Sequence, residues 1–266
     1  MKYLVIQRRN AIKALLLEKE SITINEVVQQ FGISIETARR DFDALAEEGF
    51  LNKIYGGASL RRRTSAMVPL DLLTHTFSAG KNRIAARAAR FVKNGDTIFL
   101  DSSDTVFRMC DSLMNQEITV LTNSLKAIGK LSASPSVRLI CIGGLYHPMQ
   151  EEFRGPIALE IIQNFQVDRA FITCRSFDFT HGIGTTDEDQ AFFKRSVLAH
   201  AEQVNLLADH SRFGRVSFVK FADFTDIHNI FTDEPVSSEW KEFFESHSIS
   251  CYECLADNAS ESDTSP

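Results

Sequence analysis

From Lys81 onward, short apolar runs alternate with amphipathic segments of helical length, and this alternation restricts the possible folds more than any other feature of the chain. Apolar strands that alternate with helices form a mostly parallel β-sheet with helices on both faces. The sequence therefore predicts an α/β domain. Its expected strands are residues 97–101, 118–123, 137–144, 169–174, 204–209 and 227–233, and its expected helices are residues 83–92, 106–113, 124–131, 157–165 and 190–202.

The first 60 residues carry a different pattern, in which helical periodicity is followed by two short alternating runs. Apolar residues at helical spacing predict helices over 7–17 and 25–31, and a third helix that Ser34 caps and Gly49 ends. The segment FLNKIYGGASL predicts two short strands around a Gly56-Gly57 turn. Three helices followed by such a hairpin are typical of a winged helix-turn-helix, whose third helix lies in the major groove of DNA.

The charge of the chain is divided unevenly between this N-terminal segment and the rest. Residues 1–63 hold 11 Lys and Arg against 8 Asp and Glu, whereas the remainder holds 18 against 27. A basic segment on an acidic body predicts that only the N-terminal segment contacts a polyanion. We expect contacts with double-stranded DNA from the third helix and the hairpin, namely from Ser34, Glu36, Thr37, Arg39, Arg40, Lys53, Tyr55, Gly56 and Gly57.

Two interpretations of the third helix are open. In the first, Arg40 makes a bidentate contact with guanine, whereas Arg39, Lys53 and Arg8 are better placed for phosphates. In the second, Glu36 and Arg40 form an ordinary i, i+4 surface pair that contributes about a few tenths of a kcal/mol. The hairpin and the local excess of positive charge favour DNA binding.

Composition predicts the boundaries between the parts of the chain. Residues 61–80 carry a basic triplet, a proline and small polar residues, which are typical of a linker. The closing residues ADNASESDTSP are small and polar, so we expect disorder there. The predicted organisation is a winged helix-turn-helix domain at 1–57, a linker at 58–74, an effector-binding α/β domain at 75–255 and a disordered tail at 256–266.

The predicted parallel sheet brings several polar loops to one edge. Ligands of open α/β sheets bind beyond the carboxyl ends of the strands, where backbone N–H groups at helix starts can hold a phosphate. Any one of these loops alone is more simply ordinary turn chemistry, but five of them share the edge. The expected effector-binding residues are Asp101, Ser102, Ser103, Asp104, Thr105, Asn123, Ser124, Gly143, Gly144, Arg175, Lys194, Asp209 and Arg212.

The stretch SIETARRDFDALAEEGFLNKIYGGA resembles the N-terminal signature of the DeoR family of bacterial transcriptional regulators. Later segments, among them VLTNS, FRGPIALEII, VDRAFI and LLADHSRFG, follow the effector-domain motifs of that family in order. The resemblance implies an effector domain similar in fold to ribose-5-phosphate isomerase, and a repressor of a carbohydrate operon that a phosphorylated sugar or related metabolite releases from operator DNA. We also expect a homo-oligomer, a dimer or a tetramer, because one short helix reads few base pairs.

The same resemblance leaves an alternative, a sugar-phosphate isomerase-like enzyme with a DNA-binding head. The isomerases carry two acidic residues where this chain has Ile172 and Arg175, a catalytic glutamate where it has Lys194, and a catalytic lysine near Thr185. Enediol isomerisation needs a carboxylate base to move the proton. We therefore expect a binding protein and not an enzyme.

The first effector loop departs from the family pattern Asp-Ser-Gly-Thr-Thr. This chain has Ser103 in place of the glycine and Asp104 in place of a threonine. A serine disfavours positive φ, and an ionised Asp104 would repel a phosphate. Binding then requires that Arg175, Lys194 or Arg212 offsets this charge or that Asp104 turns away, so we expect an effector that is either not a simple monophosphate or bound through these cations. The alternative is that Asp104 caps the following helix and never faces the ligand.

The five cysteines are odd in number and lack framework spacing, which favours reduced thiols in a cytoplasm. Cys251 and Cys254 have metal-like spacing, so a thiol or metal sensor is a further alternative, although no second Cys/His pair lies nearby. We expect no metal and no cofactor. No apolar run reaches the length of a membrane span, so no membrane partner is expected.

Overall fold

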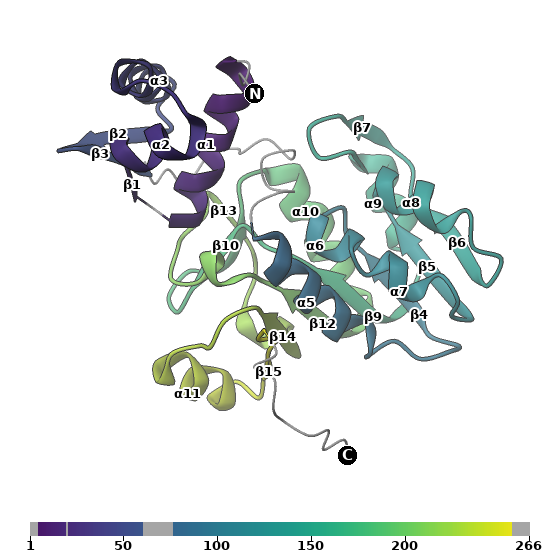
Figure 1. Ribbon diagram of the computed structural model, residues 1–266. Helices are drawn as coiled ribbons and strands as arrows, with labels where there is room; N and C mark the ends of the chain where they lie inside the picture. The colour runs from purple at the N-terminus through teal and green to yellow at the C-terminus, as the bar shows by residue number, and fades with distance from the viewer. Residues whose placement is uncertain (1–4, 20, 61–76, 257–266) are drawn as a thin grey trace. The chain divides into compact units, whose positions relative to one another are not determined.

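The computed structural model describes residues 5–19, 21–60 and 77–256, and the chain divides between Ser78 and Ala79 into two compact units (Figure 1). The predicted linker over 58–74 begins too early, because residues 58–60 belong to β3 (Gly57–Leu60), which is paired with a strand on each side. The rest of the predicted linker, and all of the predicted tail except Ala256, lie outside the described residues.

The N-terminal unit, as described, combines three helices with a three-stranded sheet of order β1-β3-β2. This arrangement confirms the predicted winged helix-turn-helix and adds strand β1, which pairs with β3. Strand β1 was not predicted because three residues are too short to show alternation. The elements are α1 (Val5–Lys19), β1 (Ser21–Thr23), α2 (Ile24–Phe31), α3 (Ile35–Glu47), β2 (Leu51–Ile54) and β3 (Gly57–Leu60).

Local sequence sets where these helices begin and end. Thr23 caps α2 and forms a capping box with Glu26, and Gly32 ends the helix in the left-handed conformation. Ser34 accepts a hydrogen bond from the backbone N–H of Thr37 at the start of α3. The apolar faces of the helices then form one core, which includes Ile12, Leu16, Val27, Ala38, Phe42 and Leu45.

The second unit is built on a seven-stranded sheet of order β15-β14-β12-β9-β4-β5-β6. Every pair of neighbouring strands in this sheet is parallel. The predicted mostly parallel α/β fold is therefore confirmed. The strands are β4 (Thr97–Leu100), β5 (Ile118–Thr122), β6 (Val137–Cys141), β9 (Val167–Ile172), β12 (Ala201–Leu207), β14 (Asn229–Thr232) and β15 (Ser250–Glu253).

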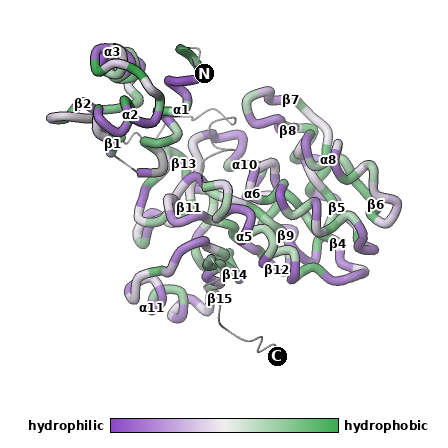
Figure 2. The backbone as a smooth tube through the Cα atoms, viewed as in Figure 1, coloured by the Kyte–Doolittle hydropathy of each residue, from purple (hydrophilic) through white to green (hydrophobic). Residues whose placement is uncertain are grey.

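Helices cover both faces of this sheet, and an apolar cluster lies on each face (Figure 1). Helices α9, α10 and α11 pack on one face, and α5 to α8 pack on the other. Side chains at successive strand positions point to opposite faces of the sheet, so they belong alternately to the two clusters. Hydrophobic residues gather along the central strands (Figure 2). The helices are α5 (Ser78–Ala89), α6 (Asp104–Phe107), α7 (Cys110–Leu113), α8 (Leu125–Leu131), α9 (Pro156–Ile162), α10 (Glu188–Ala199) and α11 (Ser238–Ser246).

Several small elements complete the unit, and none of them was predicted. Their strands are three or four residues long, so their apolar positions follow no sustained period. Helix α11 and strand β15 were also missed, and the single helix expected over 106–113 is divided into α6 and α7. The small elements are the hairpin β7 (Leu145–His147) and β8 (Glu152–Arg154), the sheet of β10 (Ser176–Asp178), β11 (Gly182–Thr185) and β13 (Val219–Ala222), and the 3-10 helices η1 (His210–Arg212) and η2 (Phe224–Asp226).

Across the described ranges, no helix is both long enough and apolar enough to cross a membrane.

Candidate nucleic-acid interface and ligand site

Helix α3 has one buried and one exposed face. Ala38, Phe42 and Leu45 lie in the core of the N-terminal unit. The predicted DNA-contacting residues Glu36, Arg39 and Arg40 lie on the exposed face, together with Ser34 before the helix, while Thr37 is half-buried. The helix therefore presents polar side chains from its first two turns, which is the part of a recognition helix that contacts base edges.

The cations of this surface are held weakly. Arg40 Nε lies 3.6 Å from Glu36 Oε1, and Lys53 Nζ lies 2.5 Å from Asp43 Oδ1, with all four side chains more than half exposed. Such exposed pairs contribute about 0–1 kcal/mol, so phosphates or bases can displace the carboxylates at little cost. Arg39 has no ion pair within the described residues.

Asp41, the residue after the two arginines of α3, has a structural role. It is 2% exposed and receives Arg8 Nε at 2.5 Å and Arg9 Nε at 3.1 Å from α1. The suggestion that Arg8 contacts phosphate is therefore wrong, because Arg8 is itself buried and its hydrogen bond to Asp41 raises its pKa. The ion pairs join α1 to α3 and so hold the exposed face of α3 in place.

The wing differs in detail from the predicted Gly56-Gly57 turn. The turn consists of Tyr55 and Gly56, and Gly57 is the first residue of β3. Gly56 has φ of 74°, whereas a Cβ on Gly57 would overlap the carbonyl oxygen of Ile22 in β1. Tyr55 is fully exposed at the tip. One glycine therefore serves the turn, and the other allows two strands to approach each other.

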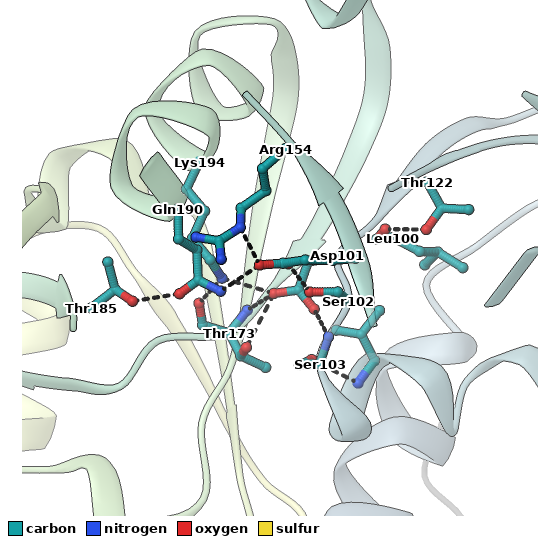
Figure 3. A network of polar contacts seen from close by, with 12 residues as sticks. Leu100, Asp101, Ser102, Ser103, Thr122, Arg154, Thr173, Thr185, Gln190 and Lys194 are labelled. Carbon is teal, nitrogen blue, oxygen red and sulfur yellow. Dashed lines mark hydrogen bonds and ion pairs between the residues drawn. The ribbon is translucent and has the colours of Figure 1, made fainter. Parts of the chain in front are cut away.

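In the second unit, the predicted ligand residues follow the carboxyl ends of the parallel strands. The strand order runs outward in opposite directions from β4 and β9, so the switch point of the sheet lies between these two strands. Asp101 follows β4 at this point and binds across it, accepting from Thr173 N at 2.7 Å and Thr173 Oγ1 at 3.1 Å (Figure 3). Asp101 Oδ1 also accepts from Ser103 N.

Lys194 of α10 is bound to the same carboxylate. Its Nζ lies 2.9 Å from Asp101 Oδ2 and donates to the carbonyl oxygen of Thr173 at 2.6 Å. Burial alone raises the pKa of Asp101, but Lys194 and the Ser103 hydrogen bonds outweigh it and lower the pKa overall. Lys194 is thus engaged within the protein by an ion pair and a hydrogen bond.

A second set of contacts extends this network towards the β7–β8 hairpin. Glu152 accepts hydrogen bonds from Ser102 Oγ and Gln190 Nε2, and its Oε1 lies 2.8 Å from Arg154 Nε. Arg154 also binds the carboxylate of Asp187. Burial raises the pKa of Glu152 despite these partners. Residues from four separate segments are therefore joined at one edge of the sheet.

Both unusual residues of the first effector loop are engaged within the protein. Ser103 has φ of −71° and is itself the N-cap of α6, so the loop needs no glycine there. Asp104 is the first residue of α6, and its Oδ2 lies 3.5 Å from Lys81 Nζ and 3.0 Å from Arg108 Nη2. The charge of Asp104 is offset by these two cations and not by the three that were expected to do so.

The loop after β12 forms its own ion pairs. Arg212 Nε lies 3.1 Å from Asp209 Oδ2, and His210 Nδ1 lies 3.1 Å from Asp233 Oδ1. Burial opposes ionisation of Asp209, yet Arg212 and Ser211 lower its pKa overall. The hydrogen bond to Asp233 raises the pKa of His210. Arg175, after β9, has no carboxylate partner within the described residues.

The other predicted ligand residues have mainly structural positions. Ser124 caps α8, Thr105 is buried in α6, and a Cβ on Gly144 would lie 2.6 Å from the carbonyl oxygen of Arg154. Gly143 has open space around it. Asn123 is 2% exposed; its Nδ2 donates to the carbonyl oxygen of Phe153, and its Oδ1 has no donor in the described part of the chain.

Sequence reasoning missed several members of this edge, namely Lys81, Arg108, Glu152, Arg154 and Asp233. Arg154 lies inside the motif FRGPIALEII, but nothing in the sequence pairs it with Glu152 and Asp187. Of the positions compared with the isomerases, Ile172 is buried in the core, and the Thr185 hydroxyl donates to Gln190 Oε1.

The two cysteines proposed as a sensor do not form one site. Cys251 packs against the cluster on one face of the sheet, and Cys254 belongs to the cluster on the other face. Burial raises the pKa of each thiol to about 11, which disfavours the thiolate that binds metal. Among the described residues, no group of His, Cys, Asp and Glu could hold a metal ion. The geometry does not support the sensor alternative.

Two family profiles match the chain. The profile described as the DeoR-like helix-turn-helix domain matches residues 8–64, and that described as the DeoR C terminal sensor domain matches residues 76–234. The first match covers α3 and the wing, and the second covers most of the seven-stranded sheet.

Relatives match the chain over most of their own length. The chain is 32% identical to the HTH-type transcriptional regulator IolR of Bacillus subtilis, over 92% of this chain and 97% of that protein. It is 28% identical to the glycerol-3-phosphate regulon repressor of Escherichia coli, over 86% and 91%. Among solved structures, ribose 5-phosphate isomerase A of Methanocaldococcus jannaschii is similar, with a TM-score of 0.38 and 16% identity over 52% of this chain and 55% of that one.

Proposed function

Because the chain belongs to the DeoR family of transcriptional regulators, we propose that it represses a carbohydrate-metabolism operon in the cytoplasm and leaves the operator when a phosphorylated sugar binds. The observation that carries the DNA-binding half is the exposed polar face of α3, with Arg39, Arg40 and Lys53 available to DNA. The repressor assignment is supported by relatives such as the glycerol-3-phosphate regulon repressor.

The effector half is supported by the carboxyl edge of the parallel sheet. Asp101 and Thr173 mark the switch point, where ligands of open α/β sheets bind. Polar side chains from five strand ends meet there, and they include both hydrogen-bonding groups and cations. A sugar phosphate combines hydroxyls with an anion, so it suits a site of this composition.

The same edge argues for binding without catalysis. Asp101 and Asp209 each have a lowered pKa and an ion-pair partner, so neither is a ready proton acceptor. Lys194 stands where the isomerases have a catalytic glutamate, and it is bound to Asp101. Incubation of pure protein with ribose-5-phosphate should give no more isomerisation than heat-killed protein gives.

The decisive experiment selects preferred duplexes from a random library and then titrates the bound complex with a panel of sugar phosphates. The matching unphosphorylated sugars are the control. We expect one duplex family to be enriched, and one phosphorylated sugar to release it while its parent sugar does not. Failure to enrich any duplex contradicts the DNA-binding half, whereas enrichment without release by any sugar phosphate contradicts the effector half.

We further propose that the protein acts as a homo-oligomer, and an exposed apolar patch supports this. The patch surrounds the β7–β8 hairpin and the starts of α8 and α9, where the backbone N–H of Leu125 donates to the carbonyl oxygen of Glu151. Large exposed apolar residues that gather in one area mark association surfaces. The members of this patch are Leu125, Leu145, Tyr146, Met149 and Ile157.

A further inference from the structure

The ligand edge carries one arginine whose charge the protein does not neutralise. Arg175 is partly buried in the short link between β9 and β10, and within the described residues its guanidinium has no carboxylate partner. We propose that Arg175, with Arg212 beside it, binds the phosphate group of the effector, and that the first effector loop (residues 101–105) does not. This inference rests on the proposed function, since it specifies how the same edge recognises its ligand.

Chain geometry brings three arginines to this place. Arg212 Nη1 donates to the carbonyl oxygen of Arg175 at 3.4 Å, and Phe177 forms a parallel bridge with Phe213. The backbone N–H of Arg215 donates to the carbonyl oxygen of Phe177 at 3.2 Å. The segment after β9 therefore runs beside the segment after η1, and Arg175, Arg212 and Arg215 come together.

The electrostatic balance at this place favours an anion. Arg212 has Asp209 as its ion-pair partner, whereas Arg175 has no carboxylate within ion-pair distance in the described residues, although the charge of Asp209 acts on it from further away. Burial and then the charges of Arg212 and Arg215 lower the pKa of Arg175 to about 10, against an opposing effect of Asp209. A partly desolvated guanidinium without a counter-charge destabilises a fold, whereas a phosphate that accepts two parallel N–H donors would offset that cost.

The first effector loop, by contrast, has its side chains occupied. Ser102 donates to Glu152, Ser103 caps α6, and Asp104 lies between Lys81 and Arg108. Helix α6 has four residues, which is too short for a strong helix dipole at its N-terminus.

A second observation suits the sugar part of the ligand. The buried Oδ1 of Asn123 lacks a donor among the described residues, and the bond from its Nδ2 to the Phe153 carbonyl fixes which amide atom is the oxygen. Asn123 follows β5, two strands from β9, so the strand ends lie roughly 10 Å apart. A buried acceptor without a donor on the same edge as Arg175 suits a hydroxyl of the sugar part.

The test compares wild type, Arg175→Gln and Arg175→Lys by thermal unfolding and titration calorimetry. The probes are inorganic phosphate and whichever sugar phosphate releases the wild type from DNA. Arg138→Gln is the matched control, because Arg138 is an exposed arginine on β6, at the edge of the same sheet. We expect Arg175→Gln to bind both probes about tenfold more weakly or worse, Arg175→Lys to keep part of the affinity, and Arg138→Gln to behave as wild type.

The melting temperature without ligand separates binding from a structural role. Removal of an unpaired, partly buried charge should leave Arg175→Gln as stable as wild type or more stable, whereas loss of a structural arginine would lower the melting temperature. If sugar phosphate releases wild type and Arg175→Gln from DNA equally well, the inference is wrong and the proposed function stands. If phosphate binding depends on Arg175 but no sugar phosphate releases DNA, the proposed effector class is wrong and the anion site stands. If neither probe binds wild type, the inference is overturned.

Discussion

Arg40 and Lys53 both lie on the exposed surface of the N-terminal unit, but we expect them to contact different parts of DNA. Arg40→Ala should cost roughly 1–3 kcal/mol of specific binding and relax the preference at one base, because it removes a bidentate donor. Lys53→Ala should weaken binding to all sequences alike and reduce the salt dependence. Fluorescence anisotropy titrations of the two variants, with the selected duplex and with a scrambled duplex, measure both predicted changes in affinity. Unchanged base preference in Arg40→Ala would leave only the surface-pair interpretation.

Asp41 differs from its neighbour Asp43 in burial, and stability should follow that difference. Asp41→Asn leaves Arg8 and Arg9 without their common carboxylate inside the unit, so we expect a loss of about 3–5 kcal/mol. Asp43→Asn makes the same chemical change on the same helix in an exposed pair, and it should cost less than about 1 kcal/mol. Urea unfolding of the full chain, monitored by a probe in the N-terminal unit, measures both losses of unfolding free energy. Equal losses would show that the Asp41 pair is not a buried anchor.

His210 should make stability depend on pH near neutrality. Its pKa is raised by the hydrogen bond to Asp233, with Glu234 and Asp209 adding to the effect. A raised pKa in the folded state means that the stabilisation is fully present below the unfolded pKa and is lost as pH rises through the folded pKa. The difference in unfolding free energy between wild type and His210→Gln should therefore shrink as pH rises from about 6. A difference that is constant with pH would contradict the ion pair.

At the scale of elements, the two glycines of the wing differ because one of them lies where strands β1 and β3 approach closely. A Cβ on Gly57 would overlap the Ile22 carbonyl oxygen, which is backbone and cannot move without β1, whereas a Cβ on Gly56 would meet open space. Gly56→Ala suffers only from its positive φ, at about 1–2 kcal/mol. We expect Gly57→Ala to destabilise the N-terminal unit more and to weaken DNA binding more than Gly56→Ala. Thermal unfolding and duplex titration of the two variants measure these effects. A larger loss in Gly56→Ala than in Gly57→Ala would show that β1 can shift.

Helix α3 shows how one element serves two purposes. Its apolar stripe fixes the helix in the core, and the residues between the stripe positions are left to contact DNA. The Asp41 pairs add a polar anchor from α1 on the buried side. The orientation of the exposed arginines therefore depends on residues that never contact DNA.

At the scale of the whole molecule, the patch around β7 and β8 should control assembly. Leu145 and Ile157 are 65% and 61% exposed, and an aspartate at either place would put a charge into an apolar contact between two copies. We expect Leu145→Asp and Ile157→Asp to shift the mass measured by light scattering towards the monomer and to weaken operator binding. Val216→Asp is the control, because Val216 is also apolar and exposed, at 40%, and lies outside this patch. An unchanged mass in both patch variants would place the interface elsewhere.

The sequence by itself determined the local elements and the family. Periodicity and capping residues placed the third helix with its cap at Ser34, and six of the seven strands of the parallel sheet, because caps and apolar patterns depend on neighbours in the chain. The strand ends also indicated the edge where a ligand would bind. The signature around Arg39 and Arg40 indicated the family before any contact was known.

Tertiary structure alone decided which charges are free. In the sequence, nothing distinguishes four cations, namely Arg8, Lys194, Arg212 and Arg175. In the structure, Arg8 is bound to Asp41, Lys194 to Asp101 and Arg212 to Asp209. The first two carboxylates come from a different helix or loop than their cations, whereas Asp209 lies three residues before Arg212. The partner of a charge is set by packing between segments as far as 93 residues apart, which no local pattern records. For the same reason Cys251 and Cys254, close in sequence, lie on opposite faces of a sheet, and Arg175 is left as the cation without a carboxylate in the described part of that edge.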